Sequence, residues 1–271
     1  EMNMWLKETF GTDKPVIGMV HLHAMPTDPK YDAEGGIEKI VQKAKDDILA
    51  LQEGGVDGLL FCNEFAIPYT SNIRTVTVAT YARVIGELKS IMTLPFGITF
   101  CSSAYNTLDI AMATGAQFVR CVYHGASAGV YGLSSSDPGD VERHRHYIGA
   151  KDIKTLTAII SEGDEQIAPR PIKQVAKTLA FNVGPDGILV YSTTPGSAID
   201  VQKVEEIKSV TDIPVLASNG VKPETVAKIL SKTDGCIVGT GIKYDGDFYK
   251  PVDPERVKAI MKAAKEFRKD I

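Results

Sequence analysis

The chain of 271 residues lacks long apolar runs and has no basic stripe. No apolar run reaches the roughly 18 residues that a membrane-spanning helix needs. Lysine and arginine number 30 against 34 aspartate and glutamate residues, a net charge of −4, which disfavours nucleic acid as a partner. Residues 3–7 do not form a signal peptide. These absences predict a cytoplasmic protein with no membrane span and no nucleic-acid partner.

Cysteine is also scarce. The four cysteines are Cys62, Cys101, Cys121 and Cys236, and no two stand at the sequence spacing of a metal-ligand pair. Each lies in or at the end of an apolar run of strand length, which is typical of small buried residues in a reducing compartment. Cys62 and Cys101 fall at strand ends, but no histidine follows at a spacing diagnostic of a thiol nucleophile.

The composition has no break that would divide residues 1–271 into two domains. Apolar runs that we expect to be strands begin near Val16, Gly58, Phe96, Phe118, Thr155, Gly187, Val215 and Cys236. Helix-period segments follow them at 37–53, 76–91, 108–114, 141–148, 172–181, 201–210, 223–230 and 254–268. Eight strand-then-helix units in order predict an α/β protein with a single (β/α)8 TIM barrel rather than an open sheet.

One connection is unusually long. Residues 123–140 separate the fourth strand from its helix, and connections of this length are uncommon unless they are functional or disordered. The segment follows the carboxyl end of a strand, where barrel active sites form. It could be a mobile lid or an idle insertion.

Two strands near the C-terminus each end in a glycine turn. The turns are Ser218-Asn219-Gly220 and Gly239-Thr240-Gly241. Glycine lets the backbone approach a ligand and present bare N–H groups, and the loops after strands seven and eight often hold phosphate in TIM barrels. The paired turns predict a phosphate site and a small phosphorylated substrate. The alternative is that they only make tight turns between strand and helix.

Candidates for proton transfer end the first two strands. His21 and His23 alternate along one face of the first strand, and Glu64 follows the second. Histidine can act as acid, base or metal ligand near neutral pH, and a carboxylate in apolar surroundings is rarely without a partner. His21 and Glu64 are therefore predicted as catalytic, and His21, His23 and Glu64 as ligands of a divalent metal ion. Structural hydrogen bonding is the alternative for each.

Three further side chains follow strand ends. Arg120 could bind an anionic substrate or pair with a carboxylate inside the barrel, and its pattern alone favours the pairing. His124 is a catalytic candidate on the same strand face. Lys243 follows the last glycine turn and could contact phosphate, or form a Schiff base if its pKa is depressed. A solvated surface lysine is the alternative.

Several segments together resemble one family. Residues 16–22, 115–120 and 234–243 are similar to the BtpA family, and 63–65 with Pro68, 143–150 and 154–156 resemble its SgcQ branch. The resemblance spans nearly the whole chain. It implies a TIM barrel of the ribulose-phosphate-binding kind without a settled reaction. The family name is tied to photosystem I biogenesis, while the SgcQ branch is associated with sugar-utilisation genes, and nucleoside triphosphatase activity has been suggested for it.

The chain also departs from the family pattern. An Asn-rich segment after strand three and Lys-His at the end of strand five are replaced here by residues 101–103 and 160–162. The matched positions, which the resemblance carries over as site residues, are His21, Asn63, Arg120, Asn219, Gly239, Thr240 and Lys243. Asn63 and Arg120 are thereby expected to bind substrate.

We therefore expect an enzyme acting on a phosphorylated sugar or similar phosphoester, as an isomerase, epimerase or aldolase-type lyase. Paired groups of tuned pKa, here His21 and Glu64, suit proton transfer next to a carbonyl. One alternative is a metal-dependent phosphohydrolase with His21, His23, Glu64 and His124 around a divalent ion. Another is a non-catalytic assembly factor, since the fold alone cannot decide function. A homo-oligomer is compatible with all three.

Overall fold

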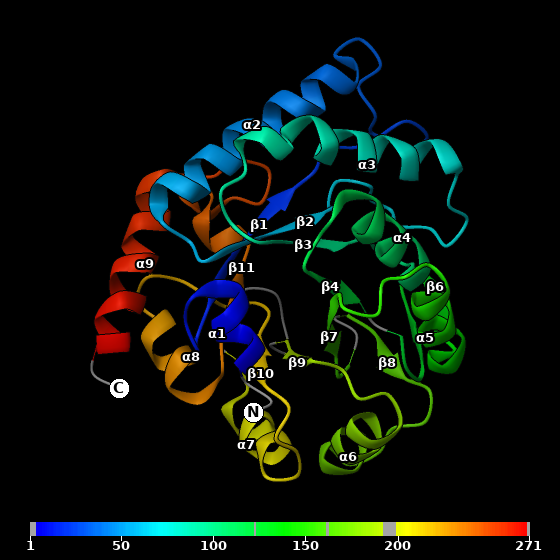
Figure 1. Cartoon of the computed structure of the whole chain (residues 1–271), viewed down its shortest axis with the longest axis vertical. Helices are drawn as coiled ribbons and strands as arrows, with labels where there is room; N and C mark the ends of the chain where they lie inside the picture. The colour runs from blue at the N-terminus through cyan, green and yellow to red at the C-terminus, as the bar shows by residue number, and fades with distance from the viewer. Residues whose placement is uncertain (1–3, 122, 161–162, 192–198, 270–271) are drawn as a thin grey trace.

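Eight parallel strands close into a barrel in a computed structural model, which describes residues 4–121, 123–160, 163–191 and 199–269 (Figure 1). In chain order these strands are β1 (Val16–His21), β2 (Gly58–Cys62), β3 (Phe96–Thr99), β4 (Phe118–Cys121), β7 (Lys154–Ala158), β9 (Gly187–Val190), β10 (Val215–Ala217) and β11 (Cys236–Val238). Each pairs with the next, and β11 pairs with β1 to complete the ring. The predicted (β/α)8 barrel is confirmed, and only the fifth strand starts one residue earlier than expected, at Lys154.

Helices surround the barrel (Figure 1). They are α2 (Gly36–Gly54), α3 (Thr75–Leu88), α4 (Ala104–Thr114), α5 (Pro138–Tyr147), α6 (Ile172–Asn182), α7 (Val201–Lys208), α8 (Val226–Lys232) and α9 (Pro254–Lys269). In α2 the buried side chains of Ile40, Ala44, Ile48 and Leu51 recur at helical spacing and face the strands. Short 3-10 turns lie at η1 (Lys89–Ile91), η2 (Thr240–Ile242) and η3 (Tyr244–Gly246).

Three predicted helix starts were wrong. Helix α5 begins at Pro138 rather than at residue 141, because the Asp137 side chain accepts a hydrogen bond from the Asp140 backbone N–H at 3.0 Å and caps the helix. Helix α4 begins at Ala104 rather than at residue 108, because the Ser103 side chain accepts a hydrogen bond from the Asn106 backbone N–H at 3.1 Å and caps the helix. Helix α8 begins at Val226 rather than at residue 223, because Lys222 to Thr225 first form a hydrogen-bonded turn.

The barrel interior is packed with alternating strand residues such as Ile17, Met19, Leu60, Leu156 and Leu216. The opposite strand faces carry the apolar residues that contact the helices. Both faces of the strands are therefore buried, which explains their continuous apolar composition.

A helix that the sequence analysis did not predict closes the amino-terminal end of the barrel. Helix α1 (Met4–Phe10) buries Trp5, Leu6 and Phe10 against the interior residues. The Phe10 ring lies edge-on to Phe118, with centroids 5.4 Å apart. The Trp5 indole N–H donates to the Asp186 carbonyl at 3.0 Å. Only seven residues long, α1 shows too little periodicity to be recognised from its sequence.

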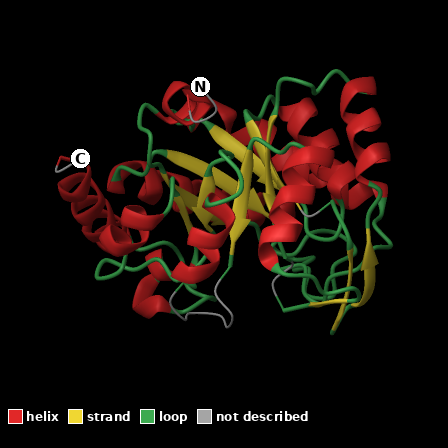
Figure 2. Cartoon of the chain, turned by 90° about the horizontal axis from the view of Figure 1, so that it is seen from below, coloured by secondary structure: helices red, strands yellow, loops and turns green. Residues whose placement is uncertain are grey.

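The segment predicted as a long loop contains a hairpin. Strands β5 (Ala126–Gly129) and β6 (Gly132–Ser135) pair antiparallel, and β8 (Glu165–Gln166) adds a third strand beside β5. The long connection predicted over 123–140 is present, but it contains this hairpin, and its last residues already belong to α5. Figure 2 shows the hairpin at the opposite end of the barrel from α1. Among the described residues, no helix is both long and apolar enough to cross a membrane.

Candidate functional site at the barrel mouth

The carboxyl ends of the strands bring several predicted side chains together. His21 ends β1 and its backbone is in register with Cys62 at the end of β2. The two side chains therefore point to the same side of the sheet, into the barrel. The Glu64 carboxylate lies 4.0 Å from the His21 ring, between Oε2 and Nε2. The predicted pairing of His21 and Glu64 across neighbouring strands is thus present in the structure.

His21 is buried, and one of its two ring nitrogens lacks a hydrogen-bond partner among the residues that the structure describes. Its side chain is 4% exposed, and Nδ1 is buried without a partner. Burial lowers its pKa to about 4, even though the Glu64 carboxylate opposes the shift. The imidazole is therefore neutral at neutral pH and can accept a proton.

Glu64 is the negative charge of the site. Burial opposes its ionisation, but the surrounding groups prevail and lower the pKa of its carboxyl. In order of effect, these groups are His21, Arg120, the Cys62 thiol and Lys243. Because His21 is itself neutral at neutral pH, the guanidinium and the ammonium are the charges that keep Glu64 ionised. The Cys62 thiol donates to Glu64 Oε2 at 2.9 Å.

Lys243 is buried, so the alternative of a solvated surface lysine is wrong. Its side chain is 2% exposed, and its ammonium donates to the Lys250 carbonyl at 3.1 Å. Burial lowers its pKa, against the negative charges of Asp47, Glu64 and Asp247. A lysine with a lowered pKa is a better nucleophile than a surface lysine, as Schiff-base chemistry requires.

Aromatic residues that the sequence analysis missed cover this group. Phe65, Phe248 and Tyr249 pack against one another, with Phe65 and Phe248 centroids 5.1 Å apart. The Lys243 ammonium lies 5.5 Å from the Phe65 centroid and 6.0 Å from that of Phe248. The His21 ring lies 5.7 Å from Phe248. This aromatic cover limits the access of water to His21 and Lys243. The cover joins side chains from loops that are far apart in sequence, so no local sequence pattern predicts it.

Arg120 projects into the barrel interior. No direct ion pair joins it to a carboxylate among the described residues, but the charge of Glu64 favours its guanidinium, after that of Tyr191, so the predicted pairing with a carboxylate is an electrostatic one. Its polar contacts within the described residues are to two sulfur atoms, Met19 Sδ at 3.6 Å and Cys62 Sγ at 3.8 Å. Sulfur is a weak acceptor, so the guanidinium keeps most of its capacity to bind an anion.

Asn63 has a structural contact. Its Oδ1 accepts a hydrogen bond from the Cys101 backbone N–H at 2.8 Å. This bond ties the end of β2 to the loop after β3. The sulfur atoms of Cys62 and Cys101 lie 3.5 Å apart, although the sequence showed no metal-ligand spacing between them. Both cysteines lie at the ends of neighbouring strands, and this shared position is the sequence feature that could have predicted their contact.

The glycine turns lie beside His21. A Cβ atom at Gly239 would stand 3.1 Å from both Cε1 and Nε2 of the His21 ring, so the second turn touches the proposed acid–base residue. A Cβ at Gly241 would lie 2.2 Å from the Val221 carbonyl, which links this turn to the segment after the first one. In the first turn, which contains Asn219, Gly220 has a φ of 73° and Ser218 Oγ is buried without a partner. Thr240 opens η2.

His124 makes its contact outside this group, and His23 reaches only the aromatic cover of the group. His124 Nε2 contacts the Ile159 carbonyl at 3.0 Å, and burial lowers its pKa. His23 stacks on Phe65, with centroids 4.8 Å apart. Among the described residues, the three ligand atoms of His21, His23 and Glu64 do not converge on one point. The metal-ligand group that does converge consists of Cys62, Glu64 and Cys101, whose ligand atoms all lie within 4.8 Å of one another.

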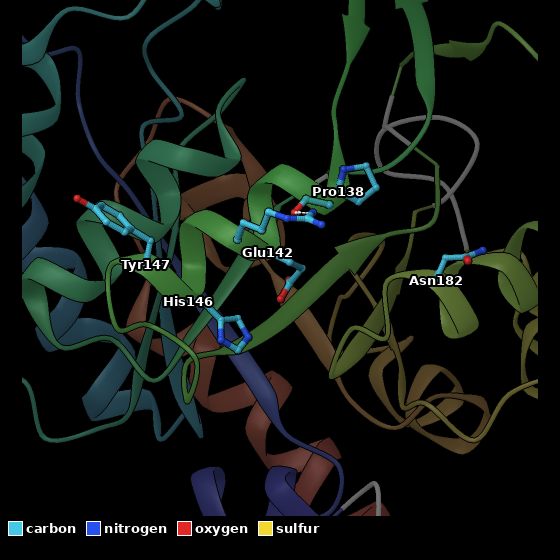
Figure 3. Close-up of a pocket in the computed structure, with 7 residues that line it drawn as sticks. Pro138, Glu142, His146, Tyr147 and Asn182 are labelled. Atoms are coloured by element: carbon cyan, nitrogen blue, oxygen red, sulfur yellow. Dashed lines mark hydrogen bonds between the residues drawn. The ribbon is translucent and has the colours of Figure 1, made fainter.

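Within the described part of the chain, a groove and a cavity lie near the barrel mouth or the helices beside it. A groove of about 620 Å³ lies outside the barrel between α5 and α6, lined by residues such as Glu142, His146 and Asn182 (Figure 3). None of the predicted site residues lines it. A cavity of about 250 Å³ beside the mouth is lined by Asn63, Cys101 and Tyr69, among others. The smaller cavity, not the larger groove, adjoins the titratable cluster.

The fold and mouth define a TIM barrel whose ionisable side chains gather at the carboxyl ends of its strands. The chain belongs to the BtpA family, which it matches over residues 12–266. It is 42% identical over 266 residues to the putative sgc region protein SgcQ of Escherichia coli K12, covering 98% of this chain and 99% of that protein. It is 27% identical to the photosystem I biogenesis protein BtpA of Synechocystis sp., covering 97% and 92%.

Solved structures show the same fold at low sequence identity. N-(5'-phosphoribosyl)anthranilate isomerase from Pyrococcus furiosus has a TM-score of 0.55 at 14% identity, covering 93% of this chain and 99% of the isomerase. Thiamine phosphate pyrophosphorylase from the same organism has a TM-score of 0.56 at 15% identity, covering 94% and 96%. The family resemblance and the barrel expected from the sequence are both confirmed.

Proposed function

We propose that the protein is an enzyme acting on a small phosphorylated carbonyl compound, such as a sugar phosphate, by isomerisation, epimerisation or aldol-type cleavage. One observation carries the proposal: the Gly239 turn touches the His21 ring, which lies 4.0 Å from the Glu64 carboxylate. A phosphate held by the turns would place the adjoining carbon chain beside these two groups. Neighbouring folds named for phosphorylated compounds support the substrate class.

The roles follow from the charge states. The ionised Glu64 removes a proton from the carbon next to the carbonyl, and the neutral His21 relays a proton at the oxygen. Arg120 binds negative charge that develops there, because its own contacts are to sulfur. Lys243, buried with a lowered pKa, could instead form a Schiff base with the carbonyl in a lyase reaction, releasing water.

The phosphate site can be tested by calorimetry with inorganic phosphate and with sugars in phosphorylated and unphosphorylated forms. We expect only the phosphorylated forms to bind. Gly239→Ala should weaken them about tenfold, roughly 1.4 kcal/mol, because the added methyl group crowds the turn against His21. Gly86→Ala is the matched control, since a Cβ there meets no atom within 4 Å. Undiminished binding to Gly239→Ala would move the phosphate site elsewhere.

An assay of inorganic phosphate released from the same compounds, beside the binding measurement, separates the alternatives. A phosphohydrolase would release inorganic phosphate from the bound compound, whereas an isomerase or lyase would leave the phosphoester intact. A non-catalytic assembly factor, like the photosystem I biogenesis protein of Synechocystis in name, would bind none of these compounds.

A further inference from the structure

The two cysteines at the ends of β2 and β3 are not explained by the proton-transfer chemistry. Cys62 Sγ lies 3.5 Å from Cys101 Sγ and 2.9 Å from Glu64 Oε2. We propose that Cys62, Cys101 and Glu64 bind a zinc-like divalent metal ion at the barrel mouth. The metal site does not rest on the phosphate site proposed above, but it shares Glu64, which as a metal ligand would no longer be the base that removes the substrate proton.

The distances suit such an ion. In a tetrahedral zinc site with Zn–S bonds of about 2.3 Å, two sulfur ligands lie about 3.8 Å apart, and a sulfur and an oxygen ligand about 3.5 Å apart. The sulfur atoms therefore need to separate by only a few tenths of an ångström from their 3.5 Å spacing. The thiol and carboxylate need to open slightly from the 2.9 Å hydrogen bond that now joins them. Two sulfur ligands select zinc over magnesium or calcium.

The charge balance also suits an ion. Binding displaces the thiol protons of Cys62 and Cys101 to solvent, so two thiolates and a carboxylate surround the dication with one excess negative charge. The Arg120 guanidinium, 3.8 Å from Cys62 Sγ, compensates that charge.

The cluster is held in place and can be reached. The Asn63 side chain binds the Cys101 backbone N–H at 2.8 Å and keeps the two sulfur atoms adjacent. Cys101 is partly exposed and lines the cavity of about 250 Å³ beside the mouth. Three protein ligands leave a fourth position for water or a substrate oxygen, the pattern of catalytic rather than structural zinc. In the metal-loaded protein Glu64 is a ligand, and His21 remains free for proton transfer.

The experiment uses the reduced, chelator-treated full chain and Co²⁺ as the probe, followed by Zn²⁺ competition. We expect one Co²⁺ per chain with a thiolate-to-cobalt charge-transfer band, which Zn²⁺ abolishes, and an affinity that rises with pH as thiol protons are released. Cys101→Ala should remove the band. Asn63→Ala should weaken binding by about 10- to 100-fold while the band persists, as expected of a positioning residue.

Cys121→Ala is the matched control, because this free cysteine is buried in β4 outside the cluster. It should leave the band unchanged. Absence of the band from the wild type, or an equal band in Cys101→Ala, would overturn the metal site. So would a Cys62–Cys101 disulfide that forms under mild oxidation in protein that takes up no Co²⁺. Because no substrate is present, these outcomes leave the phosphate proposal untouched.

Discussion

At the scale of single residues, the mouth of the barrel contains groups whose environment changes their chemistry. His21 and Lys243 are both buried, and burial lowers the pKa of each. Glu64 remains charged beside them. Neutral imidazole, lowered-pKa amine and carboxylate in one cluster are the arrangement expected of a reactive site rather than of a packed interior.

The lowered pKa of His21 makes stability depend on pH. Between the ordinary value of 6.5 and the folded value of about 4, the unfolded chain binds a proton that the folded protein does not. The free energy of unfolding should therefore fall as pH drops through this window, by up to about 3 kcal/mol, and level off below it. Denaturant titrations at several pH values give the free energy of unfolding of the wild type and of His21→Gln, and the difference between the two pH profiles measures the effect. Parallel pH profiles would contradict the buried neutral imidazole.

Glu64→Gln separates function from structure. The amide keeps an oxygen for the Cys62 thiol but loses the charge, so we expect loss of activity and metal binding with little change in melting temperature. Thermal melts beside calorimetry and metal titration give both readouts. Glu8→Gln, exposed on α1 at the other end of the barrel, is the control. A large drop in melting temperature with unchanged binding would leave Glu64 a structural residue.

At the scale of elements, the barrel could be predicted because its strands repeat one simple pattern. Seven strand starts were located to the residue, since each run is apolar on both faces and follows a turn. The hairpin β5–β6 and the helix α1 could not be predicted, because short exposed strands and a seven-residue helix carry little periodicity. In the same way, His21 and Glu64 could be predicted as site residues because they lie at strand ends. The Cys62–Cys101 pair and the packing of Phe248 on His21 could not, because they depend on contacts between distant segments.

The hairpin should be the least protected sheet of the molecule. Val130 is 86% exposed and Leu133 82% exposed, so few buried contacts stabilise β5 and β6. We expect their amides to exchange hydrogen faster than those of the barrel strands, and to slow when a phosphorylated ligand binds if the hairpin acts as a lid. Mass spectrometry of exchange with and without ligand measures this. Protection equal to that of β1 in the free protein would rule out a lid.

Helix α1 should contribute to stability out of proportion to its length. Phe10 is 8% exposed and packs on Phe118 inside the barrel. We expect Phe10→Ala to lower the free energy of unfolding by about 3–5 kcal/mol, as for other buried aromatic truncations. Denaturant unfolding provides the measurement, with the exposed Met4→Ala as control. A cost below about 1 kcal/mol would mean that α1 is only loosely attached.

At the scale of the whole molecule, hydrogen-bonded strands from β1 to β11 form one closed sheet. We propose that the chain is a single domain. Its unfolding should then be one transition when followed by the fluorescence of the lone tryptophan, Trp5, and by the helical circular dichroism signal. Two separated transitions would indicate parts that unfold independently. Sedimentation of the same samples tests whether the chain forms a homo-oligomer.

The position of α1 determines from which side a ligand can enter and leave the site. Trp5, Leu6 and Phe10 cover the amino-terminal end of an interior that is already packed with side chains, so a compound bound at the mouth can leave only on the mouth side. In the proposed reaction the product would therefore leave through the same opening by which the substrate enters. Product and substrate would compete for one site, so the product of an isomerase or epimerase should inhibit competitively with the substrate.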